Sequence, residues 1–264
     1  MEELIVIKIG GNVIDNESAL DAFLADLAVI DGHKILIHGG GKLATELSTK
    51  LGIETKMVDG RRITDKETIK VVTMTYAGFI NKNIVAKLQA KGCASIGLSG
   101  VDACIIPAVK RPVKHTDYGW VGDIKTDEIN INFICNIIES GLMPVIAPIA
   151  CDNEGHLLNI NADTVAQSFA IALSKKYKTS LVYCFEKNGV LADLGDETSA
   201  IPTIKLSDMD ELKTNGTISK GMIPKTDNAG AAIKRGVETV VIGHASHIIQ
   251  IAKKEKGYGT IIHI

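Results

Sequence analysis

The feature that most constrains the fold is an alternation, along the whole chain, of short β-branched apolar runs with longer segments of helical apolar spacing. Strands buried on both faces have continuous apolar sequences of this kind, and the longer segments supply the crossover helices. The pattern predicts an α/β fold whose mostly parallel sheet is covered on both faces. Strands are expected at residues 4–9, 34–38, 94–98, 103–109, 143–149, 157–160, 180–185, 238–242 and 260–263, and helices at 17–30, 42–51, 65–91, 126–140, 163–177, 207–213, 225–235 and 245–254.

Two strand-to-helix turns are rich in glycine. The strand containing Lys8 runs into Gly10 and Gly11, and the next strand ends in a turn of three glycines at residues 39–41. Ligands of open α/β sheets bind beyond the carboxyl ends of the strands, and free N–H groups at a helix start bind anions. The Walker and Rossmann glycine patterns are absent from the sequence, which disfavours those nucleotide sites. The alternatives are a plain tight turn and an edge-strand lysine that reaches solvent.

Three further places carry charged or amide groups in a suggestive context. Arg62 precedes a helix for which Thr64 is the expected N-cap, and a guanidinium can bind a carboxylate through two hydrogen bonds. Asn159 and Asp163 flank a predicted strand-to-helix junction, where Asp163 could also act as a simple cap. Lys225 follows a Gly-Met-Ile-Pro turn before another predicted helix. With Lys8, these residues indicate a phosphotransferase, because cations stabilise a phosphoryl group in transfer.

Composition excludes several other classes of protein. The chain has 29 basic and 31 acidic residues, so it has no general electrostatic footprint for nucleic acid. No apolar run reaches the ~20 residues of a membrane span, and no signal peptide precedes the first strand. The five cysteines show no metal-ligand spacing, so we expect buried free thiols, no metal held by protein ligands and a cytoplasmic location.

Seven short motifs occur in order along the chain: KIGGN (8–12), HGGG (38–41), GRRIT (60–64), NK (81–82), GLSGVD (97–102), NINAD (159–163) and GMIPK (221–225). This ordered set resembles the amino-acid kinase family, and within it the N-acetylglutamate kinases, from residue 4 to about residue 263. The resemblance implies a single domain with a three-layer αβα sandwich. It also implies an amino-acid-substrate lobe at residues 1–177 and an ATP lobe at 178–264.

The resemblance also implies roles for individual residues. Lys8 and Lys225 would flank the transferred phosphoryl group, and Asp163 would hold both ammonium groups. The substrate would bind at Gly40, Gly41, Arg62 and Asn159, and the phosphates at Gly10 and Gly11. The nucleotide would bind at Glu186, Lys187, Asn188, Gly189, Leu191 and Ser219. Glu186 departs from the family, which usually has an aspartate at that position.

The implied activity is ATP-dependent phosphorylation of the γ-carboxylate of an N-acyl-L-glutamate, acetylglutamate first, in arginine biosynthesis. A γ-carboxylate is already ionised at neutral pH, so the reaction needs no general base. Mg²⁺ would be carried mainly by the ATP phosphates. The alternatives are N-succinylglutamate as acceptor, a carrier-linked aminoadipate kinase of lysine biosynthesis, and a non-catalytic amino-acid sensor.

Two further expectations concern the acyl group and the assembly. The cations at residues 110, 111 and 114 could favour an extra carboxylate on the substrate, although solvated surface charge is the simpler interpretation. The amphipathic segment 65–91 is the candidate surface of a homodimer. Arginine-inhibited members of the family carry an extra N-terminal helix, for which only three residues precede the first strand here. We therefore expect a dimer that arginine does not inhibit.

Overall fold

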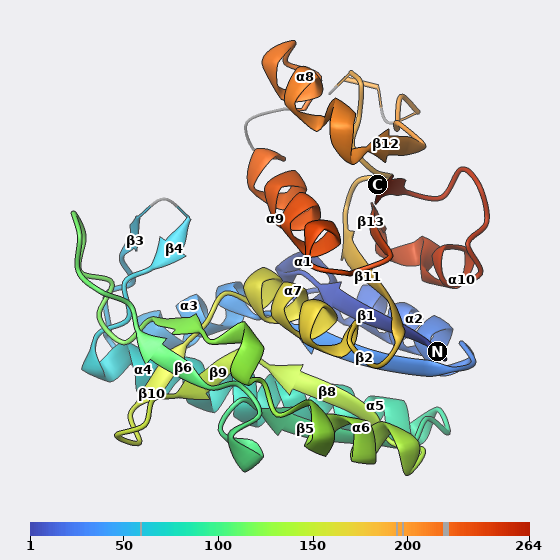
Figure 1. The fold of residues 1–264 in the computed structure, drawn as a ribbon. Coiled ribbons are helices and arrows are strands. Elements are labelled where there is room, and N and C mark those ends of the chain that lie inside the picture. Colours follow the sequence, from blue (N-terminus) through green and yellow to red (C-terminus); the bar gives the residue numbers. More distant parts are fainter. Residues whose placement is uncertain (59, 194, 197, 219–221) are drawn as a thin grey trace.

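The computed structural model describes residues 1–264 except residues 59, 194, 197 and 219–221. An eight-stranded sheet in the order β12-β14-β13-β11-β1-β2-β8-β5 forms its centre (Figure 1). Among the described strand pairs of this sheet, only β13 and β14 are antiparallel, so the predicted mostly parallel α/β fold is confirmed. The strands are β1 (Glu3–Ile9), β2 (His33–His38), β5 (Ser95–Ser99), β8 (Met143–Ala147), β11 (Lys178–Phe185), β12 (Thr203–Lys205), β13 (Thr239–His244) and β14 (Thr260–His263).

Strand β1 lies at the middle of the sheet, paired in parallel with β2 on one side and β11 on the other. Residues before 178 build the four neighbouring strands β1, β2, β8 and β5, and later residues build the other four. The pairing of β1 with β11 over seven residues joins these halves into one sheet.

Helices cover both faces of the sheet, because successive side chains of each strand point to opposite faces. In β1, Leu4 and Val6 belong to one buried cluster, whereas Ile7 and Ile9 belong to the other. The first cluster includes side chains of α6 (Ile131–Glu139), α7 (Ala162–Leu173), α8 (Met209–Thr214) and α9 (Ile223–Lys234). The second includes side chains of α2 (Glu17–Ala28), α3 (Gly41–Lys50), α4 (Lys66–Thr73), α5 (Asn81–Ala90) and α10 (Ile248–Ala252). Figure 1 shows α7 and α9 on one side of β1 and α2 on the other.

The expected long helix at 65–91 is a continuous helical segment with a π-helical turn at Met74–Ile80 between α4 and α5. The expected N-cap at Thr64 is wrong. Asp65 caps α4, and its side chain accepts hydrogen bonds from the backbone N–H groups of Glu67 and Thr68. Thr64 is instead fully buried and donates its hydroxyl to the Arg62 carbonyl.

Three small two-stranded ladders surround the carboxyl ends of the central strands: β3 (Met57–Val58) with β4 (Arg61–Arg62), β6 (Ala108–Lys110) with β7 (Gly122–Ile124), and β9 (Ile149–Cys151) with β10 (Leu157–Asn159). The loop after β6 is joined to the end of the β3–β4 hairpin, because the Thr64 N–H donates to the Tyr118 carbonyl and the Trp120 N–H donates to the Thr64 carbonyl. Figure 1 shows this loop beside the hairpin.

Two strand predictions are wrong in part. At 103–109 only residues from Pro107 onward pair, because Ala103 and Cys104 both have a φ of 49°, which no strand residue adopts. The run at 143–149 divides into β8 and β9 at Pro148, which belongs to neither strand. Of the cysteines, Cys93, Cys135 and Cys184 are buried as expected, whereas Cys104 is exposed and Cys151 is partly exposed.

Candidate active site

Three of the predicted residues meet beyond the carboxyl end of β1. The Asp163 carboxylate lies between two ammonium groups, with Oδ1 2.7 Å from Lys8 Nζ and Oδ2 3.5 Å from Lys225 Nζ. These side chains are only 14–25% exposed. The cluster therefore places two cations and one anion in a partly desolvated position where strands of both halves of the sheet end.

The fold explains why these three side chains converge. Lys8 is the second-last residue of an interior strand, so it is not the edge-strand lysine of the simpler interpretation. It shares the face of Leu4 and Val6, which is the face that α7 covers. Asp163 is in the first turn of α7, where a carboxylate is favoured by the helix dipole. Asn161, not Asp163, caps this helix by accepting from the N–H groups of Asp163 and Thr164.

Lys225 arrives from the first turn of α9, and its ammonium lies 4.5 Å from the centre of the Phe185 ring at the end of β11. Burial by itself would raise the pKa of the Asp163 carboxyl. The charges of Lys8 and then Lys225 outweigh burial and hold that pKa below its usual value. Asp163 is therefore ionised at neutral pH and is suited to position cations rather than to exchange protons.

The glycine turn after β2 is fixed by a buried polar pair. His38 Nδ1 donates to the carbonyl of Gly39, and His38 Nε2 accepts from the Asn81 amide, which also donates to the Val145 carbonyl. His38 is fully buried, and burial lowers the pKa of its imidazole to about 4. The imidazole is therefore neutral, and it orients the first peptide of the turn.

Gly40 is required in that turn for a steric reason. Its φ is 146°, and an added Cβ would lie 2.1 Å from Cδ1 of Ile80 in the π-helical turn. Helix α3 begins at the next residue, Gly41. The turn and the helical segment 66–90 can pack this closely only with glycine at position 40.

A cavity of about 220 Å³ lies against this turn. Its wall includes Gly39, Gly40, Gly41, Arg62, Tyr76, Asn159, Asn161, Ala162 and Thr164, together with Arg61 and Arg111. Ala162 and Thr164 flank Asp163 in the chain, so the cavity adjoins the lysine–aspartate cluster. All four predicted substrate-binding residues therefore line one cavity.

Arg62 is buried and is held by the elements around the cavity. Its Nη2 donates to the Gly41 carbonyl and to the Thr45 hydroxyl, both at 2.8 Å, and Nη1 donates to the Thr55 hydroxyl. Asn159 donates its side-chain amide to the hydroxyl of Thr64. Thr64 thus links the two predicted carboxylate-binding residues, because its own hydroxyl donates to the Arg62 carbonyl.

Gly10 and Gly11 form the start of α1 (Gly11–Ile14), with Gly10 as its N-cap. A Cβ added to Gly10 would lie 3.7 Å from Lys8 Nζ and so would fill space next to the ammonium group. The absence of side chains here leaves the approach to Lys8 open.

The predicted nucleotide residues fall into two groups. Glu186, Lys187 and Asn188 follow the end of β11, next to the Phe185 ring that Lys225 contacts. Gly189 and Leu191 are buried, and a Cβ on Gly189 would lie 2.5 Å from the Thr260 hydroxyl, so packing alone accounts for them. Ser219 lies outside the described residues.

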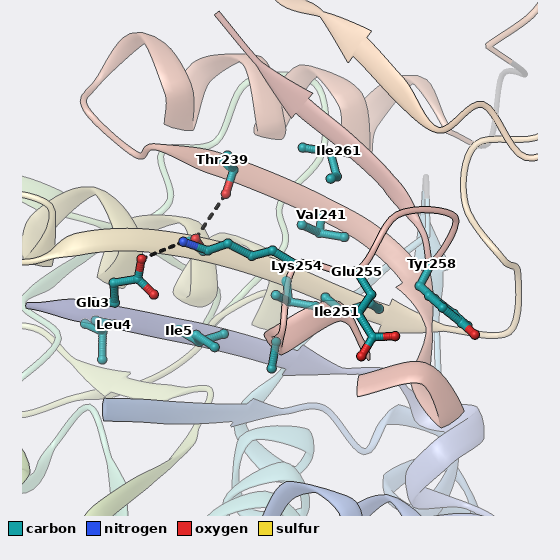
Figure 2. Close-up of a pocket in the computed structure, with 13 residues that line it drawn as sticks. Glu3, Leu4, Ile5, Thr239, Val241, Ile251, Lys254, Glu255, Tyr258 and Ile261 are labelled. Carbon is teal, nitrogen blue, oxygen red and sulfur yellow. Dashed lines mark hydrogen bonds and ion pairs between the residues drawn. The ribbon is translucent and has the colours of Figure 1, made fainter. Parts of the chain in front are cut away.

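A second cavity, of about 100 Å³, lies on the face of β1, β11 and β13 that α10 and the segment after it cover (Figure 2). Lys254 extends across these strands and its ammonium is 2.6 Å from the Glu3 carboxylate. None of the predicted site residues lines this cavity.

In the described part of the chain, no group of three or more His, Cys, Asp or Glu side chains could hold a metal ion. The described helices include none with the length and apolarity needed to cross a membrane.

Sequence reasoning missed some residues of the site. Tyr76 and Thr45 are brought to the glycine turn by helices whose apolar spacing says nothing of their polar groups, and Asn81 was found only as part of the NK motif, without a role. Arg111 belongs to a segment for which solvated charge was the simpler interpretation and an extra substrate carboxylate the other, and it lines the cavity that contains Arg62 and Asn159. The only signal for it in the sequence was the local excess of positive charge.

A mostly parallel α/β sheet with two lysines and an aspartate at its carboxyl edge is typical of α/β proteins that bind phosphate groups. Residues 3–244 match the model of the Amino acid kinase family, and the chain belongs to that family. It is 51% identical to the acetylglutamate kinase of Cytophaga hutchinsonii over 261 residues, which cover 98% of each chain. It is likewise 51% identical to the acetylglutamate kinase of Phocaeicola vulgatus, covering 99% of this chain and 98% of that one. The crystal structure of smu.665 from Streptococcus mutans UA159 has a TM-score of 0.75 at 28% identity and covers 98% of both chains. The resemblance found in the seven motifs is thus confirmed.

Proposed function

We propose that this protein transfers the γ-phosphoryl group of ATP to the γ-carboxylate of N-acetyl-L-glutamate, as a step of arginine biosynthesis. The observation that carries the proposal is the Lys8–Asp163–Lys225 cluster beside the cavity lined by Gly40, Gly41, Arg62 and Asn159. The names of the relatives that are 51% identical over nearly the whole chain support the same substrate.

In this proposal the chain contributes position and charge rather than proton transfer. Arg62 and Asn159 bind the α-carboxylate end of the substrate, which directs the γ-carboxylate toward Lys8. Lys8 and Lys225 stabilise the negative charge on the transferring group, and Asp163 keeps their ammonium groups at a fixed separation. Backbone N–H groups of Gly10, Gly11 and the turn at 39–41 face phosphate and carboxylate oxygens. An ionised carboxylate acceptor needs no base.

The nucleotide is proposed to bind over residues 186–191 and Ser219, so that residues 178–264 form the ATP lobe and 1–177 the amino-acid lobe. The contact of Lys225 with Phe185 supports this, because it brings the cation next to the start of that loop.

The Asp163 carboxylate is already occupied by two ammonium groups, so these residues fit a Mg²⁺ ion that is carried by the ATP phosphates. Such an ion would reduce repulsion between nucleotide and acceptor. We also propose that the protein forms a homodimer and acts in the cytoplasm.

The proposal is tested by trapping acyl phosphate as its hydroxamate with ATP and a panel of acceptors. N-acetyl-L-glutamate should react, whereas glutamate, aspartate and aminoadipate should give at least ten-fold lower kcat/KM. Preferential phosphorylation of aminoadipate would contradict the assignment. Binding of amino acids without any ATP turnover would instead indicate a sensor.

A further inference from the structure

A third cavity adjoins the proposed substrate cavity. It has a volume of about 340 Å³ and shares two wall residues, Arg61 and Arg111, with the cavity that contains Arg62 and Asn159. The two spaces therefore meet at a pair of guanidinium groups. One of these, Arg111, belongs to the segment 110–114, for which the sequence offered either an extra substrate carboxylate or solvated surface charge.

The wall of this third cavity is rich in positive charge. Its basic side chains include Arg61, Arg111 and Lys114, and Asp123 is the one carboxylate among its lining residues. Asp123 forms an ion pair with Arg111, whose Nη2 and Nε lie 2.6 and 3.0 Å from Asp123 Oδ1. In the part of the chain that the structure describes, Arg61 and Lys114 form no ion pair. Two cations thus have no counter-charge from the protein.

Arg111 also lacks one hydrogen-bond acceptor. Its Nη1 is buried without a partner among the described residues, and the guanidinium lies 5.6 Å from the centre of the Tyr118 ring. A buried guanidinium nitrogen without an acceptor is unfavourable. A ligand carboxylate at the shared wall, met by a small rotation of this side chain, would supply both the acceptor and the missing negative charge.

The proposed substrate fixes which part of a ligand reaches this wall. When the γ-carboxylate of an N-acylglutamate points to Lys8 and the α-carboxylate lies at Arg62, the acyl group leaves from the α-nitrogen, at the end remote from Lys8. An acetyl group ends in a methyl, which gains nothing from cations. An acyl group with its own terminal carboxylate matches them.

We propose that Arg61, Arg111 and Lys114 form a second anion subsite, which takes the free carboxylate of a dicarboxylic acyl group such as succinyl. This inference rests on the proposed kinase function and adds a specificity for the acyl chain. Lys110 does not belong to the subsite, because its ammonium lies over the Trp120 ring and it lines a different cavity.

The test compares kcat/KM for N-succinyl-, N-butyryl- and N-acetyl-L-glutamate. Succinyl and butyryl have chains of equal length, so they differ only in the terminal carboxylate. The kcat/KM for the succinyl compound should exceed that for the butyryl compound by roughly ten-fold or more, as expected for one charge-assisted contact. Equal values for succinyl and butyryl would overturn the subsite. Failure of all three compounds would overturn the kinase proposal itself, whereas turnover of acetylglutamate with rejection of succinylglutamate would overturn the subsite alone.

Lys114→Gln and Lys110→Gln provide matched variants, since both remove one positive charge from the same segment. Lys114→Gln should reduce the succinyl-over-butyryl preference by about ten-fold, and Lys110→Gln should leave it unchanged. Equal losses in both variants would indicate a diffuse charge effect and contradict a subsite.

Free succinate should inhibit turnover only weakly. Tight binding of succinate that changes acetylglutamate turnover would identify an effector site and contradict the acyl-group assignment.

Discussion

At the scale of single residues, the site depends on how one buried guanidinium and one buried imidazole are held. Arg62 bonds the Gly41 carbonyl and the hydroxyls of Thr45 and Thr55, so its orientation is fixed before a ligand enters. His38 is neutral and bonds the Gly39 carbonyl. A site organised in this way loses little conformational entropy when it binds its ligand.

Arg62→Ala should raise the KM for the acylated amino acid by roughly 30-fold or more and that for ATP much less, because a charge-assisted contact of about 2–3 kcal/mol is lost. Steady-state kinetics with each substrate varied will measure this. Arg235→Ala, which removes a surface arginine paired with Asp127, serves as the control. A raised KM for ATP with an unchanged KM for the amino acid would reverse the lobe assignment.

His38 should make folding stability depend on pH in a defined window. Burial lowers its pKa to about 4, below the unfolded value of about 6.5, so the unfolded chain binds more protons between these values. The contribution is complete above about pH 6.5 and is lost as the pH falls toward 4, by on the order of 3 kcal/mol. Urea unfolding of wild type and His38→Gln from pH 7 to 4 will measure it. The difference between the two proteins should shrink with falling pH, and a constant difference would contradict a neutral buried imidazole.

At the scale of elements, the sequence predicted the helices and strands whose apolar residues recur at a regular spacing. It did not predict the elements that depend on contacts with distant parts of the chain. The strands of the central sheet other than β12 and the helices at 17–30 and 163–177 follow from apolar spacing, whereas β12 was not predicted. Strands β3, β4 and β7 are two or three residues long, too short to show a period. The cap at Asp65 was missed because Thr64, an equally good capping residue by type, is used to link Arg62 and Asn159.

The candidate site likewise contains residues that the sequence could predict and positions that it could not. Lys8, Asp163 and Lys225 could be predicted because each lies next to a glycine turn or in the first turn of a helix, within a recognisable motif. Their separations could not be predicted, since these depend on the pairing of β1 with β11 and on the docking of α7 and α9. The position of Arg111 near Arg62 and Asn159 could not be predicted either, because the loop after β6 is placed by its hydrogen bonds to Thr64.

Gly40→Ala tests the contact between the glycine turn and the π-helical turn. A side chain at a φ of 146° with its Cβ 2.1 Å from Ile80 Cδ1 forces one of the two elements to move, so unfolding free energy should fall by about 2 kcal/mol or more. Thermal unfolding will show the loss. Gly52→Ala is the control, because that glycine has a positive φ of 71° but no atom near an added Cβ. Equal losses in both variants would mean that backbone strain, and not the contact, accounts for the effect.

At the scale of the whole molecule, most apolar side chains of the segment 65–91 face the core, and Met74 and Phe79 remain 53% and 65% exposed. Both lie in the π-helical turn. If this segment forms the surface of a homodimer, Phe79→Asp should convert the dimer to monomer, because a charge would be buried at the interface. Sedimentation will measure the mass, with Val29→Asp, another exposed apolar residue, as the control. A monomeric wild type, or an unaffected dimer in Phe79→Asp, would contradict this surface.

The sheet as a whole joins the two halves of the chain where Lys8 and Lys225 meet Asp163. The most direct test of the account is therefore the rate at which Lys8→Ala and Lys225→Ala form acyl phosphate from ATP and N-acetyl-L-glutamate at saturating substrates. Each variant should lose roughly 100-fold or more in kcat with a smaller change in the KM for ATP, because the stabilisation grows in the transition state. Near-normal kcat in either folded variant would contradict the assignment of this pair of lysines to phosphoryl transfer.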